Sequence, residues 1–147
     1  MSISQRLTKP LVVIPNALSL RFSRHIDTLF LICHKSTFNI SLQALRLIMQ
    51  ICQSLATNPS SSSSNTLQTS ISDRYYRALY ASLQDSRLNS SSKQAMYLNL
   101  LLKSLKMDTK PERVKAFVRR FVQLLVAAGS GGIEFVAGGL FLLGEVS

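Results

Sequence analysis

Apolar residues recur at the spacing of an α-helix over most of this chain. From Ile26 to Cys33 they fall at positions i, i+3, i+4 and i+7, and the stripe that starts at Leu42 repeats this spacing as far as Cys52. Residues at these intervals share one face of a helix. The pattern therefore predicts two antiparallel helices within residues 26–54, joined by a few residues.

Four further helices are predicted after residue 71. Ser72 is a good N-cap for the first of them, and its apolar stripe consists of Tyr76, Leu79, Tyr80 and Leu83. The stripes of the next two are Ala95, Leu98, Leu101, Leu102 and Leu105, and then Val114, Phe117, Val118, Phe121, Val122 and Leu125. Thr109 and Glu112 form a T-x-x-E capping box ahead of the latter. The last helix runs from about Ile133 to the end of the chain, after the sequence GSGG.

A serine-rich stretch interrupts this pattern between the second and third helices. The sequence NPSSSSSNTLQTS, residues 58–70, offers little apolar surface for burial and is typical of a loop. The sequence thus predicts four parts. They are a disordered or extended leader (1–25), a helical hairpin (26–54), a serine-rich loop (55–71) and a helical-repeat segment (72–147).

About six helices with short connections and no alternating strands predict an all-α fold. Antiparallel hairpins that stack on one another give a HEAT-like α-solenoid. The twenty residues from Leu124 to Leu143 carry one charge, Glu134, and are long enough to span a membrane. However, the helical register continues back to Val114 across the cations Lys115, Arg119 and Arg120, and a glutamate within the span is costly in lipid. We therefore expect no membrane contact.

The residues that carry catalytic or metal chemistry are few and scattered. His25 and His34 do not have the i, i+4 spacing of a helical metal site. Cys33 and Cys52 lie outside any zinc or redox motif and are expected to be buried thiols, with a disulfide as the alternative. GSGG matches neither a nucleophile elbow nor a phosphate loop. We expect no enzymatic activity, no metal or other cofactor and no small-molecule substrate.

The charge is the remaining signal, because 17 Lys and Arg residues outnumber seven Asp and Glu residues and give a net charge of +10. Such a surplus favours a polyanion, although a solvated helix face is the alternative. Tyr75 lies off the stripe of its helix and is a candidate for stacking on a base. The candidate RNA-binding or partner-binding face consists of Lys103, Lys106, Lys110, Arg113, Lys115, Arg119 and Arg120.

The leader has a composition of its own. Its cations Arg6, Lys9, Arg21 and Arg24 precede the first acid of the chain, Asp27. Serine and arginine without acids are typical of a transit peptide, but Pro10 and Pro15 interrupt any amphipathic helix there. Organelle targeting is therefore kept as an alternative to a leader without regular structure.

Several blocks in order resemble the CCAAT-binding-factor domain family of nucleolar ribosome-biogenesis proteins. They are DRYYRALYASLQDSRL (73–88), SSKQAMYLNLLLKSLK (91–106), RVKAFVRR (113–120) and GGLFLLGEV (138–146). Members of that family are longer than this chain. The resemblance therefore implies that the chain is a fragment or a truncated copy, and its final helix is expected to expose apolar side chains.

The resemblance also implies a function. It implies a non-enzymatic helical-repeat scaffold in the nucleus and nucleolus, which contacts pre-ribosomal RNA and sister nucleolar-complex proteins during large-subunit (pre-60S) assembly. Two alternatives stay open. One is a transcription factor-like protein that binds CCAAT promoters, although no recognition helix is evident. The other is a partner-binding helical module without RNA contact.

Overall fold

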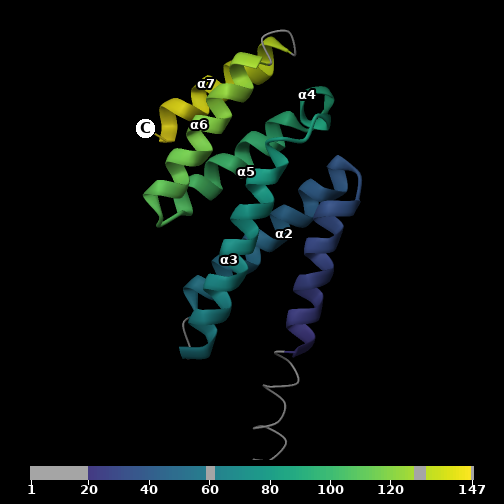
Figure 1. The fold of residues 1–147 in the computed structure, drawn as a ribbon, viewed down its shortest axis with the longest axis vertical. Coiled ribbons are helices and arrows are strands. Elements are labelled where there is room, and N and C mark those ends of the chain that lie inside the picture. Colours follow the sequence, from purple (N-terminus) through teal and green to yellow (C-terminus); the bar gives the residue numbers. More distant parts are fainter. Residues whose placement is uncertain (1–19, 59–61, 128–131, 147) are drawn as a thin grey trace, which may run out of the picture.

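The computed structural model describes residues 20–58, 62–127 and 132–146, and all regular secondary structure within these ranges is α-helical. A first helix covers residues 20–35, so the end of the predicted leader belongs to it, while residues 1–19 lie outside the described part. The helices that follow are α2 (Phe38–Thr57), α3 (Ser62–Ser82), the single turn α4 (Arg87–Ser90), α5 (Gln94–Met107), α6 (Pro111–Ala127) and α7 (Ile133–Val146) (Figure 1). The all-α prediction is confirmed.

The structure corrects the prediction of a loop over residues 55–71. Helix α2 continues to Thr57 and α3 begins at Ser62, ten residues before the expected N-cap Ser72. The first turns of α3 gain tertiary contacts, because Ile71 is only 3% exposed and Leu67 packs against the core. Packing of this kind stabilises a helix whose sequence pattern alone is weak.

The start of α6 also differs from the prediction. The helix begins at Pro111, and the side chain of Asp108 accepts the backbone N–H of Lys110 at 3.0 Å. The sequence predicted a capping box between Thr109 and Glu112. Among the described residues, the bond from Lys110 to Asp108 lies at the start of the helix instead. Proline at the first helical position is as expected, because its missing N–H has no partner within the helix.

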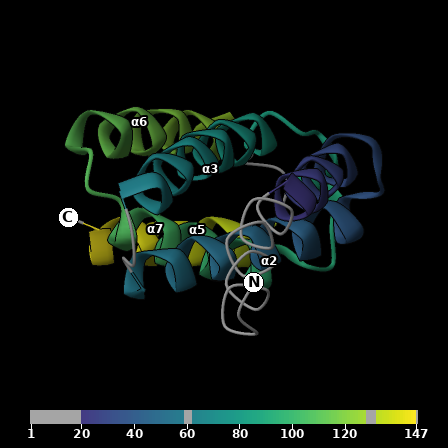
Figure 2. The same ribbon diagram turned by 90° about the horizontal axis from the view of Figure 1, so that it is seen from below.

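The helices form two layers. Figure 2 shows α3 and α6 side by side in one layer, with α2, α5 and α7 in the other. Helix α5 contacts α2 on one side and α7 on the other. The first helix lies beside α3, where Arg74 pairs with Asp27 at 2.7 Å and covers the ring of Phe30 at 4.3 Å. Three helix pairs are therefore stacked in sequence, namely 20–35 with α2, α3 with α5, and α6 with α7, as expected for a HEAT-like repeat.

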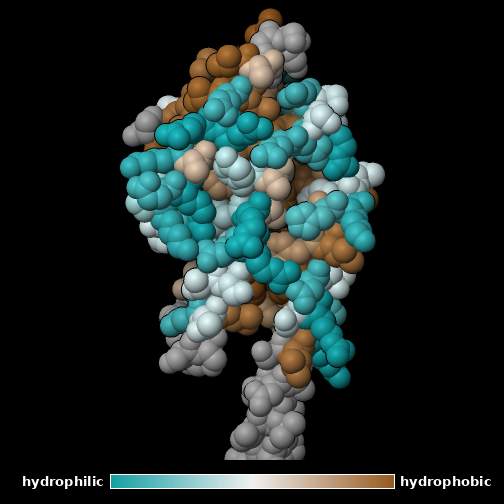
Figure 3. All heavy atoms as spheres, viewed as in Figure 1, coloured by the Kyte–Doolittle hydropathy of each residue, from teal (hydrophilic) through white to brown (hydrophobic). Residues whose placement is uncertain are grey.

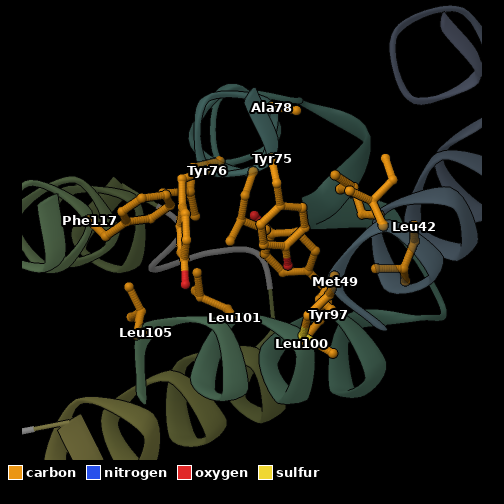
Figure 4. Packing of buried hydrophobic residues seen from close by; sticks show 14 of the residues in the cluster. Leu42, Met49, Tyr75, Tyr76, Ala78, Tyr97, Leu100, Leu101, Leu105 and Phe117 are labelled. Carbon is orange, nitrogen blue, oxygen red and sulfur yellow. The ribbon is translucent and has the colours of Figure 1, made fainter. Parts of the chain in front are cut away.

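The core lies between the layers and is rich in tyrosine (Figure 4). Tyr75 of α3 and Tyr97 of α5 are 0% exposed. Each buried hydroxyl has a partner: Tyr75 Oη lies 2.6 Å from Ser104 Oγ, and Tyr97 Oη lies 2.7 Å from Ser82 Oγ. Burial raises the pKa of both phenols, because the phenolate would lose its hydration.

Two glycines let α7 lie close to both of its neighbours. A Cβ atom on Gly138 would come within 2.8 Å of Leu98 on α5, and one on Gly139 within 2.6 Å of Leu125 on α6. These distances are shorter than any normal carbon–carbon contact. A side chain at either position would therefore require Leu98 or Leu125 to move, and the two glycines permit the close approach of α7 to α5 and α6.

The two cysteines are unpaired, as expected. Cys52 is buried and Cys33 is half-buried. Loss of hydration raises the pKa of each thiol to about 11, so both are protonated at neutral pH and poor nucleophiles.

Candidate nucleic-acid interface

The seven predicted cations do not form one surface. Lys103 and Lys106 lie on α5, in the layer with α2 and α7. The other five precede or belong to α6, which lies in the opposite layer beside α3. The candidate interface is therefore divided between two sides of the stack, and its members differ in accessibility.

Arg113 is a structural residue. Its guanidinium binds Asp108 through Nε at 2.6 Å and Asp73 through Nη1 at 2.8 Å, and it covers the ring of Tyr76 at 3.9 Å. The side chain of Asp108 is 0% exposed and that of Arg113 only 20%. The contacts fasten α6 to α3 and to the connection after α5. They also leave little of the guanidinium open to a phosphate.

Lys110 takes part in the same cluster. Its Nζ donates to Asp73 Oδ1 at 2.9 Å. This hydrogen bond, together with the one from Arg113, holds the pKa of Asp73 below its usual value, because both cations stabilise the carboxylate. Lys110 and Arg113 thus neutralise the acids beside them, so the groove between α3 and α6 carries less positive charge than the sequence suggests.

The remaining cations on α5 and α6 are more accessible. Lys106 pairs with Glu145 and Lys115 with Glu112, each at 3.3 Å, in exposed pairs that contribute little to stability. Lys103 and Arg119 are exposed and form no ion pair within the described residues. Arg120 is half-buried and donates to Gln123 Oε1 at 3.3 Å. Lys115 and Arg119 lie one turn apart on α6, and both are exposed.

Tyr75 is not available for base stacking, which corrects the prediction. Its ring is fully buried and meets the edge of Tyr76 at a centroid distance of 5.2 Å. Helix α3 packs on one side against α6, through Tyr76 and Tyr80 on Phe117, and on another side against α5, through Tyr75 and Ser104. A helix with neighbours on several sides buries more than one stripe, and the apolar periodicity did not show this.

Arg77 was absent from the candidate set but is exposed on α3. Figure 3 shows hydrophilic residues over much of α3 and α6 on this side. The exposed side chain of Arg77 borders the groove between the first helix and α3 as well as the groove between α3 and α6. The signal for it in the sequence was its place among the cations between Ser72 and Arg120.

The sequence of this stack matches that of a known family. Residues 41–147 match the model of the CBF/Mak21 family. The chain belongs to the CBF/Mak21 family. The resemblance found in the sequence is thereby confirmed.

Proteins from several organisms are similar in sequence to this chain. The chain is 45% identical over 123 residues to Ribosome biogenesis protein NOC1 of Chaetomium thermophilum, which covers 84% of this chain and 10% of that protein. It is 43% identical over 121 residues to CCAAT/enhancer-binding protein zeta of Mus musculus (82% and 10%). It is 31% identical over 104 residues to Nucleolar complex protein 1 of Drosophila melanogaster (69% and 8%). The chain thus spans about a tenth of the length of these relatives, and no solved structure matches it.

Two of the blocks that resemble the CBF/Mak21 family supply residues to the interior of the stack. The block 73–88 supplies Tyr75, Tyr76, Leu79 and Leu83, all of which are buried. The block 138–146 supplies Gly139, which lies against Leu125. The likeness to the family therefore includes buried residues of the stack and does not by itself identify a binding surface.

Two other classes of site are absent from the part of the chain that the structure describes. No group of three or more His, Cys, Asp or Glu side chains in it is arranged to hold a metal ion. None of its helices combines the length and the apolar character that a membrane crossing requires.

Proposed function

We propose that this CBF/Mak21 chain is a helical-repeat part of a non-enzymatic scaffold for ribosome biogenesis. It acts in the nucleus and nucleolus during assembly of the large subunit. The observation that carries the proposal is the stack of three helix pairs, combined with similarity to proteins named for ribosome biogenesis and for a nucleolar complex. Stacked helix pairs offer extended surfaces for binding rather than a closed pocket for catalysis.

The scaffold contacts pre-ribosomal RNA through the open cations Lys115 and Arg119, supported by Arg120 and, from the other layer, Lys103. Neutralising phosphates releases counterions, so the affinity falls steeply with salt and depends little on base sequence. Arg113 and Lys110 are left out of this contact because they are held by Asp73 and Asp108.

Charge reversal tests the RNA contact. The variant Lys115→Glu/Arg119→Glu should bind transcripts of large-subunit pre-rRNA more weakly. The dependence of log affinity on log salt concentration should become shallower, with the magnitude of its slope smaller by about two, roughly one per lost phosphate contact. The control Arg21→Glu/Arg24→Glu changes the net charge equally, at exposed positions of the first helix. Circular dichroism should stay helical for both variants. An equal loss in the control variant would show that the RNA is held by net charge alone.

A module that binds protein partners without RNA is the second candidate. It is favoured by the neutralised cations of the groove between α3 and α6 and by exposed apolar side chains on α6 and α7. In that case the unmodified chain would show no affinity for pre-rRNA that depends on salt. Scaffolding of large-subunit particles would then rest on contacts with other nucleolar-complex proteins.

A further inference from the structure

An aromatic groove lies between α3 and α6. Tyr76 and Tyr80 of α3 pack on Phe117 of α6, with ring centroids 6.2 and 5.3 Å apart, and all three rings line the groove. The exposed residues Arg77 of α3 and Ala116 of α6 line it as well. The groove has a volume of about 440 Å³, which is within the range of sites that hold small organic groups.

The hydroxyl of Tyr80 is open to a ligand. The other two tyrosines of α3 are engaged in the core, because Tyr75 bonds to Ser104 Oγ and Tyr76 donates to the backbone oxygen of Ser104. Tyr80 is half-buried, and its hydroxyl has no hydrogen-bond partner within the described residues. Its side chain therefore offers a second ring both apolar area and a hydrogen bond.

The groove also carries a free cation. Asp73 binds two of the cations that line it, Lys110 and Arg113, at 2.9 and 2.8 Å. The exposed guanidinium of Arg77 has no acidic partner in the part of the chain that the structure describes. The lining therefore has a surplus of positive charge, and Arg77 supplies the group that can bind an anion.

The groove opens on the side of the stack. It lies between two helices of one layer, with α5 and α7 in the other, so it opens away from the second layer (Figure 2). Further helix pairs at either end would lengthen the layer and leave this side uncovered. Arg119 and Arg120 lie one turn along α6 from Ala116. A row of cations beside an aromatic groove suits the successive phosphates and bases of a nucleic acid better than it suits a single carboxylate.

We propose that the groove between α3 and α6 receives an unpaired base of a single-stranded RNA, with the base against Tyr80 and the adjoining phosphate on Arg77. The phosphates that follow run along α6 toward Arg119 and Arg120. This inference rests on the proposed RNA contact and adds an aromatic subsite to it. Paired bases of a duplex are not free to enter the groove, so the site selects single strands.

Two oligonucleotides of equal charge test the base contact. One is a labelled oligouridine of about 12 nucleotides, and the other is its abasic analogue, which has the same phosphates and no bases. Fluorescence anisotropy with the full chain should show that oligouridine binds more tightly, by about fivefold or more, because one base stacks in the groove. Equal affinities for the two strands would overturn the proposal.

Filling the groove locates this preference. Ala116→Leu adds bulk to the lining and keeps a residue of high helix propensity. It should lower the affinity for oligouridine to that for the abasic strand and change the latter little. Ala95→Leu is the matched control, because Ala95 is exposed on α5 in the other layer, and it should retain the preference. A preference that survives Ala116→Leu would contradict the proposed site.

The two ligand-binding side chains have separable roles. Tyr80→Leu should remove the preference for oligouridine, whereas Tyr80→Phe should keep most of it because the ring remains. Arg77→Gln should weaken binding of both strands and reduce the magnitude of the salt slope by about one. Arg24→Gln removes the same charge at an exposed position of the first helix and should leave the slope unchanged. Equal slopes for these two variants, or a preference that Tyr80→Leu retains, would rule the assignment out. Circular dichroism checks that each variant stays helical.

The outcomes distinguish this site from the wider RNA contact. If neither strand shows an affinity that depends on salt, the RNA contact of the proposed function fails together with the groove. If both strands bind equally well, only the groove fails. A labelled peptide with phenylalanine among glutamates probes the competing occupant. The groove is a protein site, and the proposal is overturned, if Ala116→Leu abolishes binding of this peptide and leaves binding of oligouridine unaffected.

Discussion

Ser104 shows how a single polar residue takes a place in this core. It is 0% exposed on α5, and its hydroxyl lies 2.6 Å from Tyr75 Oη and 2.7 Å from the backbone oxygen of Leu100. The sequence predicted a purely apolar stripe that included Ala95, which is exposed in the structure. The buried side of α5 instead includes Tyr97 and Ser104, because their hydroxyls find partners there.

Replacing Ser104 should therefore destabilise the protein. Ser104→Ala removes the partner of the buried Tyr75 hydroxyl and should lower the free energy of unfolding by about 1–3 kcal/mol. Urea unfolding followed by circular dichroism measures the change. Adding Tyr75→Phe should recover part of the loss, because no unpaired hydroxyl then remains. Additive losses in the double variant would contradict this account of the pair.

At the level of elements, α7 depends on where its glycines lie. Gly139 faces α6, with Leu125 and Phe121 beside it, whereas Gly144 has open space around it. The three glycines of α7 have the same weak helix propensity, so the sequence does not distinguish them. Their effects on stability differ because only some of them face a neighbouring helix.

This difference gives opposite expectations for two alanine substitutions. Gly139→Ala places a Cβ atom 2.6 Å from Leu125 Cδ2 and should lower the free energy of unfolding by about 1–3 kcal/mol through overpacking. Gly144→Ala meets no neighbour and should raise it by about 0.5–1 kcal/mol through helix propensity. Thermal and urea unfolding compare the two variants. If both substitutions stabilise the chain, the close approach of α6 and α7 is not as described.

At the level of the whole molecule, the cluster around Asp73 joins two successive helix pairs. Asp73 belongs to α3, Asp108 to the connection after α5, and Lys110 and Arg113 to the start of α6. The bonds from Lys110 and Arg113 lower the pKa of Asp73 in the folded state. Its contribution to stability is therefore present above its unfolded pKa of about 4 and is lost as the pH falls through the lower, folded value.

The cluster predicts a pH dependence that one substitution removes. Asp73→Asn should lower stability at neutral pH and flatten the decline in the free energy of unfolding as the solution becomes acidic. Urea titrations at a series of pH values measure both effects. Glu134→Gln is the control, because Glu134 is exposed and forms no ion pair within the described residues, and it should leave the profile unchanged. An unaltered profile for Asp73→Asn would show that other carboxylates govern acid unfolding.

The fold of the whole molecule also determines which cations are accessible. The sequence located a basic region but treated its cations as one face. The fold divides them between two layers, encloses Arg113 and leaves Lys115 and Arg119 exposed on α6. The expectation that the final helix exposes apolar side chains is confirmed by Ile133, Leu140 and Phe141.

The sequence by itself determined the features that depend on near neighbours along the chain. The apolar period fixed that the chain is helical and roughly where most helices lie, because residues three and four apart share a helix face. The amino-acid composition and order also determined the net charge and the blocks that resemble the CBF/Mak21 family. Only the tertiary structure decided that α3 begins at Ser62, that Tyr75 is buried and that Arg113 binds two acids. Each of these depends on side chains that are distant in sequence and meet only when the helix pairs stack.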